Sequence, residues 1–245
     1  MSLYTRLWRM LHLDGRPSAI EHAPVHRVTA PSRAARVAAR AHMLAYSQRR
    51  QGPGTGSDLR LLRTMGGKTM RWWQSAIEVI ADGGTKVAVA GAVAANSYMP
   101  PRQTGDLDLA VAAHEIEAAE RSLRMAGWKF VCPLSLYGGL TGSAWIKSEH
   151  PLDLLGLPEP WGIDALAAAQ KNRASHGLPT LTLEYLVVMK LISARPQDSA
   201  DIARMLGAAS PAQIDRVRRA ARQVLPDEID VLDQMIALGK LEYGG

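Results

Sequence analysis

The sequence predicts an α/β fold, in the broader sense α+β, with a mixed sheet flanked by helices and a C-terminal helical region. Two patterns carry this prediction. Helical and strand-like segments alternate between residues 70 and 178, and only helical periodicity follows from residue 179. A chain of 245 residues can bury a sizeable core and usually forms one or two domains. We therefore expect a basic N-terminal extension (1–69), an α/β core (70–178) and a helical region (179–245).

The N-terminal extension combines helical patterns with a strong positive charge. Its residues predict a short helix in 2–13, a second helix in 31–50 capped by Ser32, and a glycine- and proline-rich linker in 51–58. Up to Arg71 the chain carries thirteen Lys or Arg residues against three Asp or Glu, whereas the net charge of the whole chain is only +6. Such an arm either contacts a polyanion such as RNA or is an ordinary solvated terminus.

The α/β core begins with an amphipathic helix and continues through alternating strands and helices. Glycines follow two of the helical segments, at Gly83-Gly84 and at Gly127, and glycine readily ends a helix. Short runs of small and branched apolar residues predict the strands. The expected helices span 70–84, 92–98 and 114–127, and the expected strands span 86–91, 106–111, 128–132, 143–147 and 151–155.

The C-terminal region reads as four consecutive helices. Thr182 and Ser210 are residue types that cap helix N-termini, and Pro211 suits a first helical position. Apolar residues recur at helical spacing after each of these signals. The expected helices span 182–194, 198–206, 210–225 and 226–241.

Composition excludes several classes of protein. The single cysteine, Cys132, cannot form an internal disulfide and fits a reducing compartment. No apolar run reaches the length of a membrane-spanning helix, which is roughly 20 residues, and no secretory signal is visible. The histidines lack the spacing of zinc ligands. We therefore expect a cytoplasmic protein that has no membrane partner.

Three aspartates lie in predicted strands. Asp106 and Asp108 are separated by one residue, so a strand places both on the same face. Two carboxylates on one face resist burial unless a cation neutralises them, and Mg²⁺ prefers such oxygens. Taken alone, the pair is more typical of a solvated strand end. Two other features favour the metal site. Asp153 lies in the apolar strand 151–155, where a carboxylate is costly unless it binds a cation. At Gly91 a strand breaks into a helix, and a phosphate can bind at the N-terminus of such a helix.

Taken in order, these features resemble the nucleotidyltransferase superfamily, in which a glycine-containing turn precedes a D-x-D or D-x-E strand and a third carboxylate. The resemblance is closest to the toxin-like branch related to the abortive-infection AbiEii toxins of toxin–antitoxin pairs. Its motifs read like G-G-x-A-x-x-x-Y-x-x-x-R-x-T-x-D-h-D and K-L-x-A-x-R-x-x-D-x-x-D. The matching residues between 70 and 206 are Gly91, Ala92, Ala94, Tyr98, Arg102, Thr104, Asp106 and Asp108, then Lys190, Arg195, Asp198 and Asp201. One departure is Ala92, which keeps the backbone donor but lacks the hydroxyl of a serine.

The resemblance implies transfer of a nucleoside monophosphate from a nucleoside triphosphate to an acceptor hydroxyl, with two Mg²⁺ ions. It makes Asp106, Asp108 and Asp153 the metal ligands, with Asp153 as proton acceptor. Lys190 would be catalytic and bind the triphosphate. The other nucleotide-binding residues that it implies are Gly91, Ala92, Arg102 and Arg195.

The resemblance also implies partners. The acceptor would be RNA, most closely the 3′ end of tRNA, and a cognate antitoxin protein would neutralise the enzyme. Two alternatives stay open. The nucleotide could be transferred to a small molecule such as an antibiotic or to a protein hydroxyl, or the fold could have lost catalysis and retained only binding.

The charged residues around the aspartates have structural alternatives. Lys190 follows an apolar run, so its ammonium either points into the site or extends outward to solvent. Arg102 either binds a phosphate or pairs with a carboxylate. Arg195 and Asp198 are spaced as a structural pair that would position Lys190. Thr104 and Asn96 are expected to make local hydrogen bonds rather than to act in catalysis.

Overall fold

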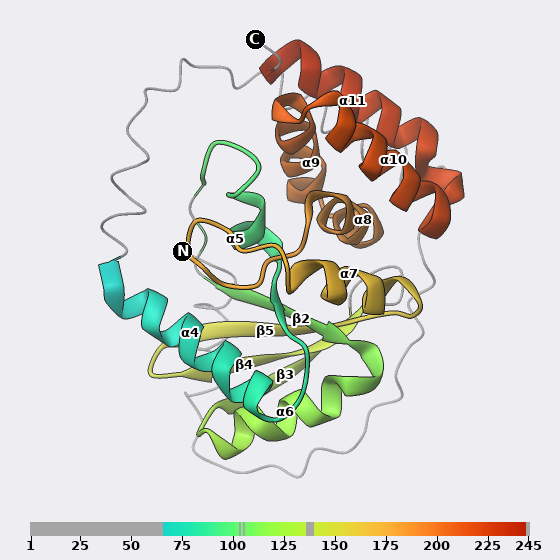
Figure 1. Cartoon of the computed structure of the whole chain (residues 1–245). Helices are drawn as coiled ribbons and strands as arrows, with labels where there is room; N and C mark the ends of the chain where they lie inside the picture. The colour runs from blue at the N-terminus through green and yellow to red at the C-terminus, as the bar shows by residue number, and fades with distance from the viewer. Residues whose placement is uncertain (1–65, 103, 105, 136–139, 244–245) are drawn as a thin grey trace, which may run out of the picture. The chain divides into compact units, whose positions relative to one another are not determined.

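The computed structural model describes residues 66–102, 104, 106–135 and 140–243, all of which belong to one compact unit (Figure 1). The predicted N-terminal helices and linker lie outside these residues, and so does nearly all of the predicted extension 1–69. Element labels follow Figure 1, in which the numbering of the described helices begins at α4.

The described strands form one mixed five-stranded sheet, which confirms the predicted fold class. The strands are β1 (Ala88–Val89), β2 (Leu107–Ala112), β3 (Lys129–Ser135), β4 (Thr141–Lys147) and β5 (His150–Leu157). They lie in the order β1-β2-β5-β4-β3, in which β2 and β5 are parallel and the other neighbours are antiparallel. β1 is shorter than the predicted strand 86–91, because the chain leaves the strand and starts a helix at Gly91.

Two helices cover one face of this sheet (Figure 1). The elements on this face are α4 (Gly66–Asp82), the short 3-10 helix η1 (Ala113–Glu115) and α6 (Ile116–Met125). Ala119 and Leu123 of α6 point inward and are fully buried. The ring of Trp72 in α4 lies next to the ring of His150, and the ammonium of Lys147 lies over the Trp72 ring. The tryptophan therefore packs α4 onto the β4–β5 hairpin.

The opposite face carries α5 and α7. These helices are α5 (Gly91–Ala95) and α7 (Trp161–Ala169). The sequence did not predict α7, because its exposed positions include apolar residues such as Ile163 and Ala167 and therefore hide the helical period. Gly162 allows α7 to start against the end of β5, where a Cβ would lie 2.5 Å from the carbonyl oxygen of Leu157.

The C-terminal helices pack on one another beyond this face (Figure 1). They are α8 (Leu183–Ser193), α9 (Pro196–Ala208), α10 (Pro211–Val224), the 3-10 helix η3 (Pro226–Glu228) and α11 (Ile229–Tyr243), close to the predicted spans. Two glycines let α9 and α11 approach closely, since a Cβ on Gly207 would lie 2.4 Å from the carbonyl oxygen of Gly239. Among the helices of the described ranges, none has the length and apolarity that crossing a membrane requires.

The segment that leads into α8 joins the free edge of β1. Val89 pairs with Thr180 in the parallel direction. The N–H of Val89 donates to the carbonyl oxygen of Pro179 at 2.7 Å, and the N–H of Leu181 donates to that of Val89 at 3.0 Å. The hydroxyl of Tyr98 also donates to the carbonyl of Leu181, at 3.0 Å. These bonds hold the start of α8 beside the turn at Gly91.

The two predicted helix caps, Ser210 and Thr182, differ in their hydrogen bonds. Ser210 forms a capping box, because its hydroxyl accepts from the N–H of Gln213 and the Gln213 side chain accepts from the N–H of Ser210. Thr182 occupies the N-cap position of α8, but its hydroxyl is buried without a hydrogen-bond partner among the residues that the structure describes.

We expect Ser210→Ala to lower the free energy of unfolding by about 1 kcal/mol. Thr182→Val should leave it unchanged or raise it.

Urea unfolding followed by circular dichroism measures both effects. Thr182→Val is the matched control, because it alters a second N-cap while keeping the shape of the side chain. Equal losses of stability in the two variants would contradict the difference between the caps.

Candidate functional site

The two predicted strands that carry the candidate aspartates are neighbours in the sheet. β2 and β5 run parallel, and Asp108 is paired in register with Asp153. Residues paired in register point to the same face of a sheet, so both carboxylates project on the side of α5. The same row continues through Ala144 of β4 to Cys132 of β3. Burial and the charge of Asp153 raise the pKa of the Cys132 thiol, so the thiol lies within electrostatic reach of that carboxylate.

Gly91 brings the start of α5 directly onto Asp108. Its φ is +56°, and a Cβ built on it would lie 1.6 Å from Oδ2 of Asp108. Glycine is required here for both reasons, because other residues avoid this φ and have no room for a side chain. The backbone N–H of Ala92 donates to the Asp108 carboxylate. The turn thus contacts an aspartate, and the phosphate contacts of Gly91 and Ala92 stay a prediction.

Asp106 lies one residue before β2 and is oriented by a hydroxyl. Oγ1 of Thr104 donates to Oδ1 of Asp106 at 2.6 Å. Asn96 holds the main chain of Arg102 in the same segment, because its Oδ1 accepts from the Arg102 N–H at 3.0 Å and its Nδ2 donates to the Arg102 carbonyl at 2.9 Å. Thr104 and Asn96 therefore make the local hydrogen bonds that the sequence analysis expected.

The electrostatic environment of Asp108 is unbalanced. Its pKa is raised from 3.8 to about 6, chiefly by burial and then by the neighbouring Asp106 carboxylate. The charges of Arg195 and Lys190 and the N–H of Ala92 act in the opposite direction but do not offset these effects. A further positive charge close to the carboxylate would favour its ionised form.

Lys190 is buried among carboxylates and does not extend outward. It is 1% exposed, and its Nζ donates to Oδ1 of Asp198 at 2.7 Å and to Oδ2 of Asp201 at 2.8 Å. Burial alone would raise the pKa values of both aspartates, but their cationic partners lower them below the usual range. Lys190 thus neutralises two aspartates in this structure, and its contact with a triphosphate stays a prediction.

Arg102 pairs with a carboxylate, which is one of the two alternatives that the sequence left open. Its Nε and Nη2 donate to Oδ1 and Oδ2 of Asp201 at 2.9 and 2.8 Å. This two-point arrangement is the strong form of an arginine–carboxylate pair. The side chain of Asp201 is completely buried, whereas that of Arg102 is 25% exposed. A further contact of Arg102 with a nucleotide stays a prediction.

Arg195 is one of three exposed residues, with Pro196 and Gln197, in what we call the α8–α9 corner, residues 190–201. Its Nε donates to Oδ2 of Asp198 at 2.8 Å, and its side chain is 51% exposed. The hydroxyl of Ser193 donates to the same oxygen, a contact that sequence reasoning missed because a serine at a helix end has no distinctive pattern. Burial lowers the pKa of Arg195, but the carboxylates of Asp198, Asp108 and Asp106 raise it by more than that, so the guanidinium lies within electrostatic reach of the D-x-D carboxylates.

The three predicted metal ligands fit Mg²⁺ by ligand type, since all are carboxylates and Mg²⁺ prefers oxygen. Burial and the Asp106 carboxylate raise the pKa of Asp108, and a divalent cation bound to it would lower that pKa. Within the described ranges, however, no three His, Cys, Asp or Glu side chains gather closely enough to hold a metal ion. Coordination by Asp106, Asp108 and Asp153 would therefore require their side chains to come closer together than in this structure.

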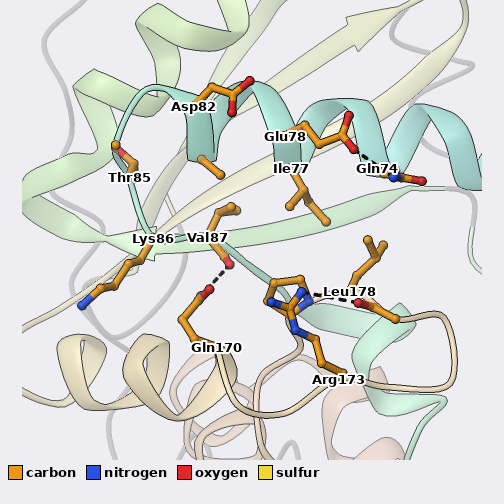
Figure 2. A pocket seen from close by; sticks show the side chains of 14 residues that line it. Gln74, Ile77, Glu78, Asp82, Thr85, Lys86, Val87, Gln170, Arg173 and Leu178 are labelled. Atoms are coloured by element: carbon orange, nitrogen blue, oxygen red, sulfur yellow. Dashed lines mark hydrogen bonds between the residues drawn. The ribbon is translucent and has the colours of Figure 1, made fainter.

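A separate pocket of about 480 Å³ lies between α4, the chain that enters β1 and the segment after α7 (Figure 2). Apolar side chains of Ile77, Val87 and Leu178 form part of its lining. Figure 2 also shows Gln170, whose side-chain amide donates to the carbonyl oxygen of Val87 at 3.1 Å. Residues that the sequence singled out as catalytic do not line this pocket, so it is distinct from the carboxylate site.

No protein-family model matches the chain, and no curated protein matches it. Two solved structures of ANT(2'')-Ia are similar to it. One is a solution structure of this antibiotic-resistance factor, with a TM-score of 0.38 and 13% identity, covering 69% of this chain and 91% of that chain. The other is a crystal structure in complex with adenylyl-2"-tobramycin, with a TM-score of 0.40 and 14% identity, covering 71% and 98%. Likenesses this distant carry no argument about function.

The close approach of Gly91 to Asp108 predicts a large effect of a single methyl group. We expect Gly91→Ala to lower the free energy of unfolding by about 2–4 kcal/mol, because it combines a strained φ with a collision. Gly84→Ala is the matched control, since Gly84 also has a left-handed φ, of +84°, but a Cβ there would meet nothing within 4 Å. Urea unfolding measures both. If the two variants lose the same stability, the collision with Asp108 contributes nothing.

The raised pKa of Asp108 predicts that this residue costs stability at neutral pH. An acid whose pKa is higher in the folded state than in the unfolded state destabilises the fold once pH exceeds the unfolded value. Asp108→Asn should therefore raise the free energy of unfolding by about 1–3 kcal/mol at pH 7.5. The gain should shrink as pH falls from about 6, the folded pKa, toward 3.8, the ordinary value. Urea unfolding across this range measures it, and a gain that is constant with pH would contradict the assignment.

Proposed function

We propose that this protein is a metal-dependent nucleotidyltransferase that transfers a nucleoside monophosphate from a nucleoside triphosphate to a hydroxyl of RNA. The observation that carries the proposal is the pairing of Asp108 with Asp153 in adjacent parallel strands, directly beside the Gly91 turn. This arrangement joins three separate segments that the sequence motifs had singled out. The raised pKa of Asp108 supports a functional role for this residue, because perturbed pKa values cluster at functional sites.

In this proposal Asp106, Asp108 and Asp153 hold Mg²⁺, which when bound supplies positive charge to the triphosphate and to the oxygens of the transition state. The acceptor oxygen forms a bond to the α-phosphorus, and the bond from that phosphorus to the β-phosphate oxygen breaks. Pyrophosphate leaves, and the hydroxyl proton passes to Asp153. No net oxidation occurs, and the products are the nucleotidylated acceptor and pyrophosphate.

The basic residues have two different roles in the proposal. Arg195 is half-exposed and lies within electrostatic reach of the D-x-D carboxylates, so its guanidinium is available to donate to phosphate oxygens. Lys190 contributes positive charge from the buried side, because its ammonium acts on Asp108 while it is bonded to Asp198 and Asp201. Backbone N–H groups at Gly91 and Ala92 would complete the phosphate contacts.

The RNA acceptor is supported by charge. The chain up to Arg71 is strongly basic, and α10 exposes three further arginines, Arg216, Arg219 and Arg222. Clustered arginines bind phosphate backbones through counterion release. The resemblance to the toxin-like branch adds the 3′ end of tRNA as the acceptor and a neutralising antitoxin as a partner.

Nucleotide transfer tests the proposal directly. The full-length protein is incubated with Mg²⁺, total tRNA and each α-labelled nucleoside triphosphate in turn, and labelled RNA is resolved on a gel. We expect at least one nucleotide to label tRNA, and Asp108→Ala to lower the rate by about 100-fold or more, the scale of losing one electrostatic group of a catalytic site.

The exposed Asp164 of α7 supplies a matched control, since Asp164→Asn removes a solvent-exposed carboxylate that belongs to neither strand of the pair. Circular dichroism checks that each variant is folded. Undiminished labelling by Asp108→Ala would refute the proposal. Labelling of an added aminoglycoside, but not of RNA, would keep the transferase and replace its acceptor.

A further inference from the structure

We infer that Arg102 and Asp201 form a positioning latch, which holds the D-x-D segment in a set place against the α8–α9 corner. Neither residue is a ligand of the substrate in this inference. Its meaning for catalysis rests on the proposed nucleotidyltransferase function, whereas the latch itself is a statement about geometry that can be tested without activity.

The first half of the latch is the segment before β2. Asn96, at the end of α5, holds both the N–H and the carbonyl of Arg102. The side chain of Arg102 then makes its two-point pair with Asp201, at 2.9 and 2.8 Å. Asp106 follows four residues later, with its carboxylate oriented by Thr104 at 2.6 Å. Asp106 is therefore close to the pair along the chain.

The second half of the latch is the corner itself. Oδ2 of Asp201 also accepts from Lys190 at 2.8 Å, and Lys190 donates in turn to Asp198 at 2.7 Å. Asp198 holds Arg195, whose charge acts on Asp108 and Asp106. A displacement of Arg102 would thus be transmitted to the ammonium of Lys190 and the guanidinium of Arg195, whose charges act on Asp108.

Burial distinguishes positioning from direct contact. The side chain of Asp201 is 0% exposed, so a substrate cannot reach it without unfolding the corner. Both donors of Arg102 that face Asp201 are used, and a buried carboxylate that lost them would carry an uncompensated charge. The pair is consequently more costly to open for a phosphate than the Arg195–Asp198 pair, in which the arginine is half-exposed and the second bond, from Nη2 to Oδ1, is 3.4 Å long.

A positioning role predicts a specific kinetic pattern. Displacing reacting groups by about 1 Å can cost 100-fold in rate without loss of binding. Arg102→Lys keeps the positive charge but replaces the two-point pair with a single contact. It should lower kcat for nucleotide transfer by about 10- to 100-fold and change the KM for the nucleotide by less than about twofold.

Amide hydrogen exchange tests the latch independently of activity. In the full-length protein we expect exchange of the N–H of residue 102, which donates to Asn96, to accelerate about tenfold in Arg102→Lys and in Asp201→Asn. The double variant should exchange no faster than the faster single variant, because both remove one interaction. If Asp201→Asn does not fold, Arg102→Gln takes its place. Arg218→Lys is the matched control, since it weakens the Arg218–Asp233 pair between α10 and α11.

The outcomes separate the latch from the proposed function. Unchanged exchange in Arg102→Lys overturns the latch whether or not transfer is detected. A higher KM with unchanged kcat makes Arg102 a nucleotide ligand and also overturns the latch. Accelerated exchange in a protein that transfers no nucleotide leaves the latch standing and refutes the transferase.

Discussion

The complete burial of the Asp201 carboxylate is the constraint on which the arrangement of the site depends. A buried charge is very costly unless cations and hydrogen bonds compensate it. Two cations do so, Lys190 from α8 and Arg102 from the segment before β2. Because these cations come from distant parts of the chain, the same carboxylate also joins the segment before β2 to the C-terminal helices. The D-x-D segment and the α8–α9 corner are thereby held together.

The aspartates near this junction fall into two electrostatic kinds. Asp198 and Asp201 are surrounded by cationic partners that lower their pKa values despite burial, so they stabilise the fold when ionised. Asp108 is the opposite, because burial and Asp106 outweigh the same cations and raise its pKa to about 6. A carboxylate whose charge the fold does not fully compensate is typical of a functional group that binds something positive. The difference supports assigning structural roles to the first two and a ligand role to the third.

Local patterns in the sequence were sufficient for most elements and failed where local signals are weak. Helical spacing and glycine stops predicted α4 and α6 within a few residues. α7 was missed because apolar residues on its exposed side remove the period, and β1 was predicted too long because Gly91 ends it sharply. Thr182 has the correct residue type for a cap, but whether a hydroxyl finds a donor depends on the atoms packed around it.

The sequence by itself determined the fold class and the identity of the candidate residues, because periods of two and 3.6 residues and short motifs are local properties. Three aspartates and a set of basic residues follow one another along the chain in the order of the motifs, and from this order the sequence predicted a shared site. Only the tertiary structure decided that Asp108 and Asp153 are in register, that Lys190 is buried, and that Arg102 pairs with Asp201. Arg102 and Asp201 are far apart in sequence, so their pairing follows from the packing of α9 against the rest of the chain.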